Sequence, residues 1–164
     1  MKKLLSTDPR NWAALISRIT LGFVVFPHGA QKLFGWYGGY GFEGTMGYMT
    51  GHMNLPWIIG FLVIMIESIG ALLLIAGFLT RFCAFAILCN FIGIIFHTQL
   101  NNGFFMNWDM LPDQPEGYEY HILILGVSIV LVIVGGGRWS IDSMLNRNYV
   151  PKTNDRVPEV STGY

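Results

Sequence analysis

Four long apolar segments, separated by polar or glycine-rich stretches, dominate the hydropathy pattern of this 164-residue chain. They cover about residues 12–34, 57–78, 82–99 and 119–136. A helix needs roughly 20 mostly apolar residues to cross the hydrocarbon core of a bilayer, and these segments are close to that length. The pattern therefore predicts an all-α membrane protein: an antiparallel bundle of four transmembrane helices.

The connections between these segments differ in character. Residues 35–55 are rich in Gly, Tyr and Met, too apolar for a solvated loop and too broken for a span. We expect them to lie on the membrane surface or fold back over the bundle, with one short helix at about 42–50. The turn at Thr80-Arg81 is so short that the second and third spans must be antiparallel neighbours. Residues 100–118 form a second polar and aromatic loop, so both long loops would cap the outer side.

Composition supports a membrane protein, because 52% of the residues are hydrophobic and only 12% are charged. Ordinary soluble domains are about 25% charged. The formal net charge is zero and gives no hint of a nucleic-acid partner, so the lipid bilayer is the expected surrounding. Cys83 and Cys89 are six residues apart and point to different faces of a helix, which argues against a disulfide between them.

Basic residues concentrate at one end of the predicted bundle, and only Lys32 lies at the edge of the other end. The positive-inside rule then places both chain termini in the cytoplasm. Residues 1–11 are predicted to be a cytoplasmic tail, 12–145 the membrane domain, and 146–164 a disordered cytoplasmic tail. The basic residues of the inner side are Lys2, Lys3, Arg10, Arg81, Arg138, Arg147, Lys152 and Arg156.

Each apolar segment carries polar residues that helical spacing brings to one face. In the first, His28, Gln31 and Lys32 are spaced i, i+3, i+4. In the third, Asn90, Gly93 and His97 share a face, and Glu67 is the only charge of the second. The topology places the three histidines of the spans in the outer half of the bundle. We therefore predict a ligand site formed by His28, Gln31, Lys32, Glu67, His97, Glu119 and His121.

Two charges, Arg18 and Glu67, approach the middle of the membrane. An unpaired charge there costs at least about 2.5–3.5 kcal/mol. We therefore predict that Arg18 and Glu67 form an ion pair across the first two spans. Such a pair would be a structural clamp, or Glu67 would be a proton carrier below a ligand pocket.

Three kinds of site would use such polar residues. A quinone site needs His or Lys to bind carbonyl oxygens and a carboxylate to take up protons. A metal or haem site needs convergent ligands, and the helices carry no HxH, HxxxH or CxxC pair, so no metal is predicted. A plain polar network, fastening the helices together, needs neither.

Several short motifs follow one another over about residues 12–145, and Glu67 with Gly70 is one of them. The others are His28-Gly29-Ala30-Gln31-Lys32-Leu33-Phe34-Gly35-Trp36, Phe42-Glu43-Gly44-Thr45, Gly77-Phe78-Leu79-Thr80-Arg81, Glu116-Gly117-Tyr118-Glu119-Tyr120-His121 and Gly135-Gly136-Gly137-Arg138-Trp139-Ser140-Ile141-Asp142. In order and spacing these motifs resemble those of the DoxX family. The lack of a CxxC pair argues against a thiol-exchanging role.

The resemblance implies a small bacterial inner-membrane protein with four helices. The family takes its name from a membrane subunit of a thiosulfate:quinone oxidoreductase, and other members are linked to thiol and oxidative-stress complexes. It therefore favours a quinone-binding subunit of a redox system, working with a redox partner subunit or as a homo-oligomer. The alternative is a non-enzymatic membrane scaffold or assembly factor for soluble redox or stress-defence enzymes.

Overall fold

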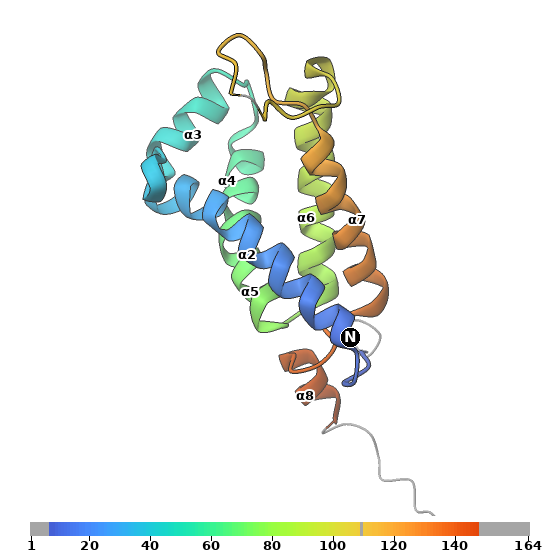
Figure 1. Cartoon of the computed structure of the whole chain (residues 1–164). Coiled ribbons are helices and arrows are strands. Elements are labelled where there is room, and N and C mark those ends of the chain that lie inside the picture. The colour runs from blue at the N-terminus through green and yellow to red at the C-terminus, as the bar shows by residue number, and fades with distance from the viewer. Residues whose placement is uncertain (1–6, 109, 148–164) are drawn as a thin grey trace, which may run out of the picture.

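The computed structural model describes residues 7–108 and 110–147, and within them all regular structure is helical (Figure 1). The predicted tails therefore lie mostly outside the described residues. Three helical segments are long and apolar enough to cross a membrane: Trp12–Phe34, Trp57–Ala76 and Thr80–Asn102. A fourth, α7 (Glu119–Val134), is apolar but only 16 residues long.

The three long segments are not all uninterrupted α-helix. The first is α2 (Trp12–Phe34) alone. The second is divided into α4 (Trp57–Met65), the π-helix η2 (Ile66–Gly70) and α5 (Ala71–Ala76). The third consists of α6 (Thr80–Ile94), the π-helix η3 (Ile95–Gln99) and the 3-10 helix η4 (Leu100–Asn102). Short helices complete the chain: η1 (Trp36–Gly38), α3 (Gly41–Gly51) and α8 (Ile141–Arg147).

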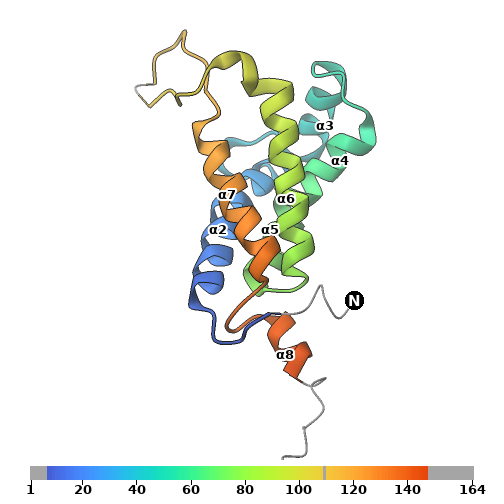
Figure 2. The ribbon, with the colours of Figure 1, turned by 90° about the vertical axis from the view of Figure 1, so that its right-hand side faces the viewer.

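Helix α7 packs along α6, and both views show them side by side (Figures 1 and 2). Helix α2 crosses η2 and α5 and also touches α7. Buried side chains such as Val25, Leu74 and Ile87 fill the centre. Large apolar side chains also cover the outside, with Phe23 72% and Leu123 67% exposed. An apolar exterior around an apolar core suits a protein whose solvent is lipid.

Two glycines allow α2 to approach its neighbours closely. A Cβ atom at Gly29 would overlap the backbone of Glu67 and Ser68, and one at Gly22 would lie 2.9 Å from the carbonyl oxygen of Ala71. Small residues at such contacts let helix backbones come together. The contact at Gly29 brings α2 against η2 at the position of Glu67.

The predicted Arg18–Glu67 ion pair is wrong. Arg18 is buried and donates to main-chain carbonyl oxygens instead, because the last carbonyls of a helix have no partner within it. Its five N–H donors can serve several of them at once. The acceptors are Leu74, Ile75, Gly136, Arg138 and Trp139, the last at 3.0 Å from Nη2.

Asp142 fastens the turn between α5 and α6 to α8. Its carboxylate accepts hydrogen bonds from the backbone N–H groups of Leu79 at 2.8 Å and Thr80 at 2.9 Å. These are donors that the start of α6 cannot satisfy internally. Gly77, in the left-handed conformation with φ 70°, makes this short turn possible.

The loop before α7 caps the opposite end of the molecule, at the top of Figure 1. Backbone hydrogen bonds from Tyr118 to Gly103 and from Glu119 to Phe104 close it. Glu119, predicted to be a ligand residue, accepts instead from the backbone N–H of Met106 at 3.2 Å and from the Trp108 indole. It therefore holds the loop rather than lining the cavity described below.

Candidate functional site

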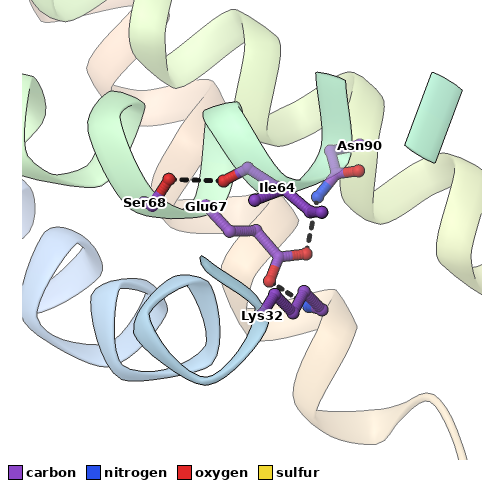
Figure 3. Close-up of polar contacts among 5 residues, drawn as sticks. All are labelled: Lys32, Ile64, Glu67, Ser68 and Asn90. Carbon is purple, nitrogen blue, oxygen red and sulfur yellow. Dashed lines mark hydrogen bonds and ion pairs between the residues drawn. The ribbon is translucent and has the colours of Figure 1, made fainter. Parts of the chain in front are cut away.

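Glu67 is the centre of a polar cluster formed by three helical segments (Figure 3). Its side chain is 1% exposed. One carboxylate oxygen is paired with the Lys32 ammonium group of α2, and the other accepts a hydrogen bond from Asn90 of α6 at 3.0 Å. Lys32 supplies the opposite charge that Arg18 was predicted to supply, so Glu67 is not left unpaired within the apolar bundle.

Local backbone geometry determines which side chain of η2 faces inward. A π-turn widens the helix by one residue and is frequent at functional sites. Within it, Ser68 donates its hydroxyl back to the carbonyl of Ile64 in the same helical segment (Figure 3). Glu67 is left to reach across to α2 and α6. Because Gly29 permits close approach there, Lys32, one turn further along α2, comes within bonding distance of Glu67.

A cavity of about 920 Å³ lies beside this cluster, partly open at one side. This volume is in the range of small-molecule sites, about 300–1,000 Å³. Mostly apolar side chains of α3, α4 and α6 form its walls. Its polar side chains include Lys32 and Asn90, the two partners of Glu67. Other polar lining residues are Gln31, Tyr40, Thr45, Tyr48, His97 and Thr98.

The structure brings together only part of the predicted site. Gln31, Lys32 and His97 line the cavity, and Glu67 lies directly behind Lys32 and Asn90. His97 lies in η3, the second π-helical segment. It follows Asn90 by seven residues, so it is about 10 Å further along the helix.

His28 and His121 do not line this cavity. Among the described residues, the lining includes none from α7, because α7 packs against α6 and α2 instead. His28 is an exposed residue of α2, whereas His121 is only 8% exposed and its ring centroid lies 5.6 Å from that of Phe91. The structure therefore separates these two histidines from His97.

Both histidines lie near enough to Glu67 for its carboxylate to act on them electrostatically, and His28 also acts on His121. The Nδ1 atom of His121 is buried and has no hydrogen-bond partner among the described residues. Glu67 is thus bonded to two side chains that line a ligand-sized cavity, and its charge also acts on the histidines of α2 and α7.

Asn90 is the site residue that sequence reasoning left out. The spacing of Asn90, Gly93 and His97 indicated a shared face, and Asn90 is the member of that face that binds Glu67. An amide inside an apolar span is the signal that identifies it. Among the described residues, no three His, Cys, Asp or Glu side chains lie close enough together to hold a metal ion.

A family model described as DoxX matches residues 13–100, more than half of the chain. The chain belongs to the DoxX family. The matched DoxX region extends from α2 through η3, so it contains Lys32, Glu67, Asn90 and His97, whereas His121 lies beyond it.

Two curated proteins are similar to this DoxX chain. "Inner membrane protein YqjF" of Escherichia coli (strain K12) is 33% identical over 154 residues, covering 91% of this chain and 100% of that protein. "Putative oxidoreductase CatD" of Bacillus subtilis (strain 168) is 28% identical over 128 residues, covering 78% of this chain and 83% of that protein. No solved structure matches. Family and apolar helices together identify a multi-pass membrane protein.

Proposed function

We propose that this DoxX protein is an inner-membrane subunit of a redox system and that its cavity binds a quinone-type ligand. The observation that carries the proposal is an apolar cavity of about 920 Å³ whose wall includes Lys32 and Asn90, both bonded to the buried Glu67. An apolar pocket with a few convergent polar groups is the usual form of a small-molecule site. The name of the Bacillus subtilis relative, an oxidoreductase, agrees with redox chemistry.

The polar residues have the chemistry that a quinone requires. Lys32, Asn90 and His97 carry N–H donors for carbonyl oxygens. Reduction of a quinone to a quinol takes up two electrons and two protons, and a redox partner protein would supply the electrons. Lys32 would pass its proton to the bound oxygen. His28 or His121 would then protonate the Glu67 carboxylate, which would in turn reprotonate Lys32, and a second round would deliver the second proton.

The proposed membrane arrangement follows from charge and helix order. α7 would be the fourth span of an antiparallel bundle, and both termini would be cytoplasmic under the positive-inside rule. Trp12 and Trp139 would then lie at the inner interface, with the Arg138 guanidinium 4.4 Å from the Trp12 ring centroid. The loop before α7 would cap the outer side, so the polar part of the cavity would lie in the outer half of the membrane.

A matched pair of glycines tests the proposal. Gly93 of α6 and Gly126 of α7 are both exposed, and a Cβ at either would meet nothing within 4 Å. Gly93 lines the cavity and Gly126 does not. In lipid nanodiscs, Gly93→Leu should weaken binding of a quinone without a tail at least tenfold, while Gly126→Leu should leave it unchanged. Equilibrium binding of the oxidised quinone, measured by extraction and chromatography, provides the readout.

Two outcomes would count against the proposal. If the unmodified protein binds no quinone, the redox role fails and a membrane scaffold for soluble enzymes becomes the better explanation. If Gly93→Leu and Gly126→Leu weaken binding equally, the ligand lies outside this cavity.

A further inference from the structure

The cavity continues along one face of α6 well beyond the polar cluster. Its lining residues on this helical segment begin at Phe82 and end at Thr98, and successive residues are separated alternately by three positions and by one, as on one face of a helix. Sixteen residues of helix correspond to about 24 Å, most of the thickness of the hydrocarbon core. A compact head group cannot fill a groove of this length.

The two halves of the groove differ in polarity. Asn90, His97 and Thr98 belong to the half that ends at η3, whereas Phe82, Phe85 and Ala86 form the other half. From Asn90 back to Phe82 is eight residues, or about 12 Å. Phe82 and Phe85 are 60% and 54% exposed. The apolar half of the groove therefore faces the surrounding lipid.

The charge of the site indicates the kind of head group. Lys32 is the only charged residue among those described as lining the cavity, and Glu67 neutralises it. A phosphate head group would need a surplus of positive charge, which Arg and Lys clusters provide. The balanced pair beside the Asn90 amide suits instead a neutral head group with acceptor oxygens.

We propose that the ligand is an isoprenoid quinone that enters sideways from the bilayer and lays the first part of its tail along Phe82, Phe85 and Ala86. This inference rests on the proposed quinone site and adds the tail and the entry route. An isoprene unit is about 5 Å long, estimated from C–C bonds of about 1.5 Å, so the groove takes two to three units. The remaining tail stays in the lipid beside α6.

The expected gain from the tail is modest in a membrane. Lipid chains are as apolar as the groove, so the tail gains contact by packing rather than by leaving water. A side chain that fills the groove should therefore lower the affinity about tenfold without abolishing binding. It should affect only ligands that carry a tail.

An alanine pair provides the test. Ala86 lines the apolar half of the groove, and Ala76, exposed at the end of α5, does not. In nanodiscs of neutral lipid, each protein would be titrated with a tailless benzoquinone and with the same head group bearing two isoprene units. Ala86→Phe should weaken the tailed ligand about tenfold and change the tailless one less than twofold. Ala76→Phe should change neither.

The outcomes separate this inference from the proposed function. If Ala86→Phe still binds the tailless quinone, its site is folded. Unchanged binding of the tailed quinone by that variant would then contradict a tail bound along the groove.

Because the larger side chain could disturb packing, Phe85→Ala serves as a second variant. It removes one wall of the groove and should weaken only the tailed ligand, about threefold. If neither quinone binds the unmodified protein, the proposed function itself fails. Displacement of the tailed quinone by anionic phospholipid would contradict the inference that the site takes a neutral head group.

Discussion

At the scale of single residues, the buried charges of this protein differ in what compensates them. Arg18 is compensated by main-chain carbonyls at the ends of helices. Glu67 is compensated by one opposite charge, Lys32, and one amide, Asn90. Carbonyls are fixed by the fold, whereas an ammonium group and a carboxylate can exchange a proton. Of the two arrangements, only the second contains a pair of side chains that can exchange a proton with each other.

The Lys32–Glu67 pair should show strong coupling in stability. Lys32→Met leaves a buried carboxylate without its cation, and breaking such a pair by removing one partner costs about 3–5 kcal/mol. The double variant Lys32→Met with Glu67→Gln keeps an acceptor for Asn90 and has no unpaired charge. It should recover most of the lost stability. Reversible unfolding in mixed micelles of the unmodified protein, Lys32→Met, Glu67→Gln and the double variant measures the coupling.

Arg10→Met, at an exposed position, is the matched control for loss of a cation. It should not change the free energy of unfolding by more than about 0.5 kcal/mol. A double variant that is no more stable than Lys32→Met alone would show that Glu67 does not depend on Lys32.

At the scale of elements, the contact between α2 and η2 determines where the site forms. The approach at Gly29 places the backbone of α2 against that of Glu67. The two π-turns carry Glu67 and His97 respectively. A π-turn shifts the register of all residues that follow it, so it changes which side chains face the centre. The site is thus a product of one close helix contact and two local departures from α-helix.

Gly29→Ala should therefore destabilise the protein by about 1–3 kcal/mol, the usual cost of overpacking, because its Cβ would overlap main-chain atoms that cannot move aside independently. Gly47 of α3 is the matched control, since a Cβ there meets nothing within 4 Å. Gly47→Ala should be neutral or stabilise by about 0.5–1 kcal/mol through helix propensity. Both free energies come from denaturant titration followed by circular dichroism. Equal stability of Gly29→Ala and the unmodified protein would contradict the close contact.

Hydropathy was sufficient to locate the elements but not to assign their partners. The spans predicted at 57–78 and 82–99 correspond to Trp57–Ala76 and Thr80–Asn102, and the short helix expected at about 42–50 is α3, Gly41–Gly51. In lipid, both the outer and the inner faces of a span are apolar, so periodicity identifies the packed face poorly. The missed pairing of Glu67 with Lys32 and the π-turns both depend on that face.

At the scale of the whole molecule, hydrogen bonds join the helices at their two ends, whereas the cavity lies along their middle. Near α8, Arg18, Asp142 and the backbone of residues 136–139 join segments that are far apart in sequence. At the other end, Glu119 closes the loop before α7. Between these two fastened ends lies the cavity, bordered by α4 and α6, which is where a ligand would enter.

This arrangement predicts that a substitution at one end of the helices can lower the stability without changing ligand affinity. Arg18→Lys keeps the charge, but an ammonium group is a single point and cannot reach carbonyls on both sides as the guanidinium fork does. It should lower the free energy of unfolding by about 2–4 kcal/mol, since hydrogen bonds to charged groups contribute about 1.5–3 kcal/mol each. The folded fraction should bind tailless quinone with unchanged affinity, because Arg18 does not line the cavity.

Arg10→Lys, at an exposed position, is the control and should change neither the free energy of unfolding nor the quinone affinity. Loss of quinone affinity in Arg18→Lys without loss of stability would show that the two ends are coupled to the site.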